Sequence, residues 1–184
     1  MKIELKKQIN EQVSNKLHEA LKLEYESGAL YEGMACWLDY NSFNKTSNFF
    51  RIHAVEERKH GSWVIDFLQN MNCMVKIPTV TAPEYKWTCL MDILKETYEH
   101  EELITKTWNE VATLSLKYAD HMSYRFAQKL LDEQKEELDL FATLIDKYNL
   151  SEGKPNSDKL FDNSIDHPAI EEEPWLEDAE KEVE

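Results

Sequence analysis

The sequence predicts an all-α protein, built as a bundle of four long helices with a long crossover between the second and the third. The composition favours helices, because the 184 residues include only four glycines and five prolines while 42% are hydrophobic. Apolar residues also recur at three- and four-residue steps along four stretches, at 9–40, 47–71, 89–117 and 122–148. We therefore predict one domain over residues 1–150, large enough for a substantial core.

The first two stretches predict a pair of helices joined by the polar, turn-like segment 41–46. Ser47 is the expected N-cap of the second helix, because a serine hydroxyl can accept a hydrogen bond from a backbone N–H of the first turn. The apolar stripe of the first helix contains Val13, Leu17, Ala20, Leu21, Tyr31, Met34, Ala35 and Leu38. That of the second contains Phe50, Ala54, Val64, Phe67, Leu68 and Met71.

The segment 73–88 contains Pro78 and Pro83 and shows no helical period. A loop of this length without secondary structure is uncommon inside a compact domain. It is expected as the long crossover that lets the second and third helices of a bundle run parallel. The third stripe then contains Leu90, Leu94, Ile104, Trp108, Val111 and Leu116. The fourth contains Phe126, Leu130, Phe141, Leu144 and Tyr148.

The helical period stops after Asn149, and residues 151–184 form a separate C-terminal segment. Residues 156–165 can form one short fifth helix. The whole segment carries 12 acidic and 3 basic residues, and its last part is interrupted by prolines. We expect this acidic tail to be mobile or bound to a surface.

The charge and the cysteines limit the function classes. With 36 Asp and Glu against 21 Lys and Arg, the net charge of −15 argues against a nucleic-acid partner and suits the attraction of cations. No stretch approaches the ~20 apolar residues of a membrane span, and the N-terminus lacks the apolar core of a signal peptide. Cys36, Cys73 and Cys89 are odd in number and form no C-x-x-C pair, which favours reduced thiols in a cytoplasmic protein.

Each predicted helix carries one glutamate in the middle of its apolar stripe. Glu57, for example, lies seven residues after Phe50 and seven before Val64, so all three share one helix face. An unpaired buried carboxylate is costly, and a pair of divalent metal ions is the simplest compensation for four of them. The four glutamates are Glu24, Glu57, Glu101 and Glu137.

The pair Glu57-x-x-His60 adds an imidazole to this set, because residues three apart are neighbours on a helix surface. Carboxylates with one nitrogen ligand suit iron, manganese or zinc, and the pattern matches the di-iron sites of four-helix bundles. A single E-x-x-H is usually a solvated helix face, and a single glutamate can reach the surface or form a salt bridge. One acid on every helix at compatible heights favours a buried metal site instead.

Five segments of this sequence resemble the non-haem bacterial ferritins over residues 23–150. They read YEGMACWLDYNSF at 31–43, FFRIHAVEERKH at 49–60, VKIPTVTAPE at 75–84, ETYEHEELITKTWNEVA at 96–112 and EQKEELDLF at 133–141. The resemblance implies a ferritin-like bundle that stores and detoxifies iron. A ferroxidase centre would oxidise Fe(II) to Fe(III) with oxygen or hydrogen peroxide, and ferric mineral would collect inside a homo-oligomeric shell of about 24 subunits.

The same resemblance assigns roles to individual residues. Glu24 and His60 resemble ligands of the first iron, and Glu57 resembles the carboxylate that bridges both irons. Glu101 resembles the main ligand of the second iron, with Gln134 close by. Tyr31 resembles the tyrosine that donates an electron or a hydrogen bond beside the centre. A third iron site is implied at Glu56, Glu133, Glu136 and Glu137.

Two departures from related families matter. Haem-binding bacterioferritins carry a second E-x-x-H on the fourth helix, but residues 133–137 here read EQKEE, so no haem is expected. Family members also have a fifth helix that lines a channel of the shell, and only 156–165 is available for it here. The other histidines (His18, His53, His100, His121) are expected to be structural or on the surface. The tryptophans Trp37, Trp63, Trp87 and Trp108 are expected to serve packing or interfaces.

Three alternatives stay open. A di-iron oxidase or peroxidase of the rubrerythrin kind would need a four-cysteine module, which three scattered cysteines do not supply. A DNA-protecting mini-ferritin holds its metal between subunits, and its partner suits a net charge of −15 poorly. A non-enzymatic helical module with structural Zn(II) or Ca(II) is the third, and an absence of iron-dependent oxygen consumption would favour it.

Overall fold

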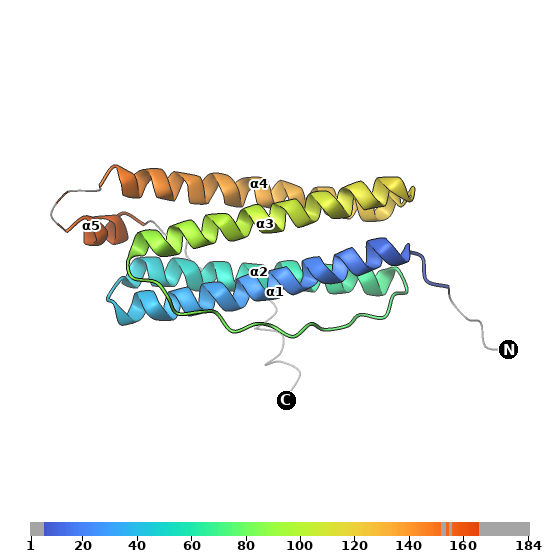
Figure 1. Ribbon diagram of the computed structural model, residues 1–184, viewed down its shortest axis with the longest axis horizontal. Coiled ribbons are helices and arrows are strands. Elements are labelled where there is room, and N and C mark those ends of the chain that lie inside the picture. Colours follow the sequence, from blue (N-terminus) through green and yellow to red (C-terminus); the bar gives the residue numbers. More distant parts are fainter. Residues whose placement is uncertain (1–5, 152–153, 155, 166–184) are drawn as a thin grey trace, which may run out of the picture.

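The computed structural model describes residues 6–151, 154 and 156–165. Within this part the chain forms five helices: α1 (Glu11–Tyr40), α2 (Asn44–Asn70), α3 (Leu90–Lys117), α4 (His121–Asn149) and α5 (Ser157–Ser164). The four long helices lie side by side, and the crossover between α2 and α3 returns along the whole length of the bundle beside α1 (Figure 1). The predicted all-α bundle, its crossover and its short fifth helix are confirmed. The predicted acidic tail at 166–184 lies outside the described residues.

The start of α2 differs from the prediction. The helix begins at Asn44 after an N-cap at Phe43, so Ser47 lies inside the first turn and is not the cap. The Ser47 hydroxyl instead donates to the Ala35 carbonyl oxygen at 2.9 Å, which joins α2 to α1. The cap of α2 comes instead from a residue far along the chain. Asp162 Oδ1 on α5 accepts from both Thr46 N and Thr46 Oγ1 at 2.8 Å.

The other long helices have local caps. Asn10 Oδ1 accepts from Gln12 N at 2.8 Å before α1, and Asp120 Oδ1 accepts from Ser123 N at 3.0 Å before α4. At the start of α3, Asp92 Oδ2 accepts from Thr88 N at 2.8 Å. Each of these acceptors satisfies a backbone N–H at a helix start that the carbonyl oxygens of the helix cannot reach.

The core consists of two apolar clusters, one toward each end of the bundle. One contains Tyr31, Leu38, Phe50, Leu94 and Phe141, and the other contains Val13, Leu17, Leu68, Trp108 and Leu130, among others. Leu116, expected in the core, is 52% exposed, because in the last turn of α3 Ser115 occupies the buried position. The two clusters leave a polar layer at mid-bundle, and the predicted glutamates come from that layer.

Helix α5 packs against the end of the bundle formed by α2 and α4 (Figure 1). Its Phe161 is buried in the first cluster, together with Ile165 just beyond the helix. Tyr148 OH donates to Asp158 Oδ1 at 2.6 Å, and Lys45 Nζ donates to the Asn163 carbonyl oxygen at 2.9 Å. No helix in the described part of the chain is long and apolar enough to cross a membrane.

Candidate metal centre

Four helices bring one glutamate each to the middle of the bundle. Glu24 on α1, Glu57 on α2, Glu101 on α3 and Glu137 on α4 are 1%, 0%, 0% and 8% exposed. His60 follows Glu57 by one helical turn on α2 and is also buried. The apolar residues two turns away on either side of each glutamate place these carboxylates inside the bundle, as the stripes predicted.

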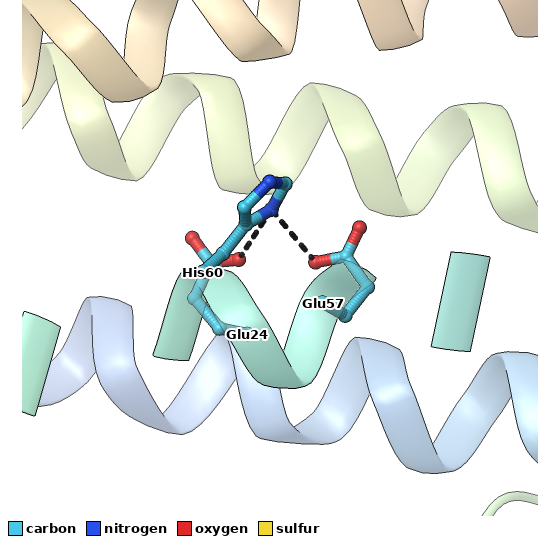
Figure 2. A group of neighbouring side chains, drawn as sticks. All are labelled: Glu24, Glu57 and His60. Carbon is cyan, nitrogen blue, oxygen red and sulfur yellow. Dashed lines mark ion pairs between the residues drawn. The ribbon is translucent and has the colours of Figure 1, made fainter. Parts of the chain in front are cut away.

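The five side chains form two groups that share Glu57. Glu24, Glu57 and His60 each offer a ligand atom within 4.8 Å of the others, and so do Glu57, Glu101 and Glu137. Figure 2 shows the first group, in which His60 Nδ1 lies 3.6 Å from Glu24 Oε2 and 3.7 Å from Glu57 Oε2. His60 Nδ1 also lies 3.9 Å from Glu137 Oε1. Glu57 is therefore placed to serve two neighbouring cations.

Gln134 and Tyr31 hold the second group by hydrogen bonds. Gln134 Oε1 accepts from Thr105 Oγ1 at 2.9 Å, so its amide nitrogen faces the carboxylates. That nitrogen donates to Glu101 Oε2 at 3.1 Å and to Glu137 Oε2. Tyr31 OH donates to Glu101 Oε1. Gln134, predicted as a metal ligand beside Glu101, thus contacts Glu101 through a hydrogen-bond donor, while its Oε1, the atom that could bind a metal, accepts from Thr105.

Three buried carboxylate oxygens have no hydrogen-bond partner among the described residues: both oxygens of Glu57 and Oε2 of Glu24. Leaving a buried charged group without a partner is strongly unfavourable. These oxygens all belong to the group around His60, where a bound cation would neutralise them. The donor set of carboxylates with one imidazole fits iron.

The pKa values of these acids show that their charged forms are disfavoured in the metal-free centre. Burial raises the pKa of Glu57 well above its usual value, and the charge of Glu24 raises it further. Burial and the charge of Glu101 raise the pKa of Glu137 to about 10. Burial also raises the pKa of Glu101. The metal-free centre therefore retains protons at neutral pH, and divalent cations would have to displace them.

The residues expected at a third iron site line one cavity beside the centre, of about 290 Å³. Glu56, Glu133, Glu136 and Glu137 all contribute to its wall, as does His60. Of these four acids, only Glu137 belongs to a group of three ligand atoms within 4.8 Å among the described residues. Glu56 Oε2 lies 3.0 Å from His53 Nδ1, and this contact lowers the pKa of Glu56. The four acids share a cavity but are not gathered to ligand distances.

Two contacts to the centre were not predicted from the sequence. Trp108 Nε1 donates to Glu24 Oε1 at 2.8 Å, whereas Trp108 was expected to serve only packing or an interface. Thr105, which orients Gln134, was not singled out at all. The available signal was position: Trp108 lies seven residues after Glu101, so the two occupy the same face of α3.

The remaining candidates have structural contacts. His18 Nδ1 lies 2.7 Å from the Ser14 carbonyl oxygen, and His100 Nε2 lies 2.9 Å from Ser27 Oγ. Burial lowers the pKa of His100, which favours its neutral form. Cys36, Cys73 and Cys89 are all free, as expected for reduced thiols.

Comparisons with known proteins agree with this architecture. The family model of the Ferritin-like domain matches residues 14–151. A bacterial non-heme ferritin of Escherichia coli is 37% identical over 136 residues, which cover 74% of this chain and 82% of that protein. One from Campylobacter jejuni is 32% identical over 162 residues, or 88% and 97%. The open-pore ferritin of Archaeoglobus fulgidus superimposes with a TM-score of 0.82 at 26% identity, covering 86% of this chain and 96% of its own. The chain belongs to the ferritin family.

Proposed function

We propose that this chain is a subunit of an iron-storage ferritin and that its buried glutamates form a ferroxidase centre. One observation carries the proposal: Glu57 has two buried oxygens without a hydrogen-bond partner among the described residues, and it is shared by two groups of ligands. A carboxylate in that position suits two cations side by side. The relatives named as bacterial non-heme ferritins support iron as the metal.

The substrate would be a pair of Fe(II) ions about 3.5–4 Å apart, as in other two-metal sites. Glu24 and His60 would bind the first ion, Glu101 and Glu137 the second, and Glu57 both. Oxygen or hydrogen peroxide accepts the electrons that the two Fe(II) ions lose. Anionic carboxylate oxygens stabilise Fe(III) more than Fe(II), so the ligand set favours the oxidised product.

The other residues of the centre would position these ligands. Tyr31 and Gln134 each donate to one oxygen of Glu101, which fixes the direction of that carboxylate. Because Tyr31 OH contacts a proposed ligand of the second ion, Tyr31 would also be able to supply an electron. Glu57 accepts no hydrogen bond from the described residues, so it would be the carboxylate most free to adjust when the ions change charge.

A third iron would bind in the cavity beside the centre. Glu137 belongs both to the second ligand group and to the cavity wall, so it connects the two sites. The carboxylates of Glu56, Glu133 and Glu136 supply oxygen ligands there. Because Glu56, Glu133 and Glu136 belong to no group of ligand atoms within 4.8 Å among the described residues, their side chains would have to turn inward when iron binds.

Storage requires an enclosed space, so we propose that copies of the chain assemble into a closed homo-oligomeric shell of about 24 subunits. The oxidised iron would collect inside as ferric mineral. We further propose a cytoplasmic protein that needs no haem and has no nucleic-acid or membrane partner. The net charge of −15 supports a cationic substrate.

The ferroxidase assignment is tested by Glu57→Ala, with Glu102→Ala as the matched control. Glu102 is the exposed glutamate next to Glu101 on α3. Stopped-flow absorbance should show rapid Fe(II) oxidation by native protein and the control, and a loss of the rapid phase in Glu57→Ala. Equal rates in all three proteins would refute the assignment. Tight binding of Zn(II) without iron oxidation in the native protein would indicate a structural metal site.

A further inference from the structure

Trp108 joins α3 to a candidate ligand on α1. Its side chain is completely buried in the second apolar cluster, and its indole N–H donates to Glu24 Oε1 at 2.8 Å. A T-shaped contact with Phe126, at 5.8 Å between ring centroids, restrains the indole from another side. A buried indole N–H needs an acceptor, and here that acceptor is a carboxylate of the metal centre.

The hydrogen bond makes the two oxygens of Glu24 unequal. Oε1 is occupied by the indole, while Oε2 has no hydrogen-bond partner among the described residues and lies 3.6 Å from His60 Nδ1. Figure 2 shows this carboxylate beside His60 and Glu57. We propose that Trp108 is a positioning residue, which holds Glu24 so that only Oε2 is presented to the first cation.

Three of the four buried glutamates of the centre differ in how many of their oxygens accept hydrogen bonds. Glu57 has neither oxygen hydrogen-bonded, whereas both oxygens of Glu101 accept hydrogen bonds from Tyr31 and Gln134. Glu24 is intermediate, with one oxygen occupied. Hydrogen bonds to a metal ligand commonly fix how that ligand binds its metal. Hydrogen bonds to a carboxylate are stronger than hydrogen bonds between two neutral groups. Binding through one oxygen keeps a position on the first cation open for another ligand.

This inference rests on the proposed metal centre, and packing is the alternative explanation for Trp108. Packing requires the shape of the ring, whereas positioning requires the N–H. The chain offers a matched control in Trp87, which is also buried and donates from Nε1 to Glu96 Oε2 at 2.6 Å, near the start of α3. Glu96 belongs to neither ligand group.

The experiment uses Co(II) alone as the probe, because it is not oxidised by air in such sites and its visible absorption reports the number of its ligands. Metal-free native protein, Trp108→Phe and Trp87→Phe are titrated with Co(II). A fourth protein carries benzothienylalanine in place of Trp108, installed at that position alone. This residue keeps the size and shape of the indole but has sulfur where the N–H was, so the packing of the ring is kept while the hydrogen bond is lost.

Removal of the N–H should free Glu24 Oε1 to bind as well. More ligands weaken the visible absorption of Co(II), so the absorption per bound ion should fall in both Trp108 variants and stay native in Trp87→Phe. Unchanged absorption in the benzothienylalanine protein, or an equal fall in Trp87→Phe, would overturn the positioning role. Failure of native protein to bind Co(II) would instead refute the metal centre itself.

Discussion

Glu57 and His60 lie one turn apart on α2, and His60 Nδ1 is 3.7 Å from Glu57 Oε2. The spacing in the sequence therefore becomes a shared position in space, where an imidazole faces a carboxylate that both ligand groups use. The carboxylate is fully buried and has no hydrogen-bond partner among the described residues. Because these buried oxygens are unsatisfied until a cation binds, metal binding should be linked to the stability of the fold.

The metal-free protein should be less stable at higher pH because of Glu137. Its folded-state pKa is about 10, against 4.5 for an ordinary glutamate. Between these values the folded state keeps a proton that the unfolded state releases, so the contribution present below pH 4.5 is lost as pH rises toward 10. Glu137→Gln should flatten the dependence of unfolding free energy on pH by up to about 1.4 kcal/mol per pH unit.

Thermal unfolding in metal-free buffers between pH 5 and pH 9 measures this difference, with Glu102→Gln as the exposed control. The control should follow the native profile. A Glu137→Gln profile parallel to the native one would mean that Glu137 is already ionised in the folded protein without metal.

Zn(II) should stabilise the native protein against heat. A ligand that binds only the folded state adds about 2.7 kcal/mol at 100 times its dissociation constant. Scanning calorimetry should show a higher unfolding temperature with Zn(II) and its return after chelation with EDTA. The shift should largely disappear in Glu57→Ala and persist in Glu102→Ala. A full shift in Glu57→Ala would place the stabilising ion elsewhere on the protein.

Asp162→Ala should destabilise the chain although Asp162 lies far from the metal centre. Its carboxylate accepts from the backbone and the side chain of Thr46 and so replaces the missing local cap of α2. Losing a helix cap typically costs about 0.5–2 kcal/mol. The unfolding temperature should fall in Asp162→Ala and stay native in Lys159→Ala, an exposed position on the same helix. Equal temperatures would show that this contact between α5 and α2 adds nothing to stability.

Gly61→Ala should lower stability, although alanine normally favours a helix over glycine by about 1 kcal/mol. A Cβ at this position would lie 2.5 Å from Cε1 of Tyr25, and overpacking of this kind costs about 1–3 kcal/mol. Because Tyr25 adjoins Glu24 in the chain, Co(II) affinity should fall as well. The control is Ser62→Ala, an exposed neighbour on α2. Higher stability with unchanged affinity in Gly61→Ala would show that the Tyr25 ring moves aside freely.

Most of the fold could be predicted because the spacing of apolar residues and the positions of prolines determine helices and loops locally. The four stripes gave each helix its buried face, and the prolines of the crossover marked its longest connection. The start of α2 could not be predicted in this way. Its cap, Asp162, lies 116 residues further along the chain, so Ser47 was the best local candidate and was wrong.

The buried acids of the site could be predicted for the same reason, since each interrupts an apolar stripe. Their supporting hydrogen bonds could not, because the contacts of Trp108 with Glu24 and of Thr105 with Gln134 join different helices. Spacing along one helix carries no information about which residue of another helix lies opposite. The acids of the third iron site share a cavity, and whether iron binds there stays a prediction.

An aerobic Fe(II) titration of the metal-free protein, followed by ferric absorbance against a protein-free control, tests the central claim most directly. An iron-storage ferritin should oxidise iron rapidly well beyond the two or three ions of its centre and keep the product in solution. Rapid oxidation that stops at two or three ions per chain would mean a working centre without a storage shell. Oxidation no faster than in the protein-free control would contradict the ferroxidase assignment.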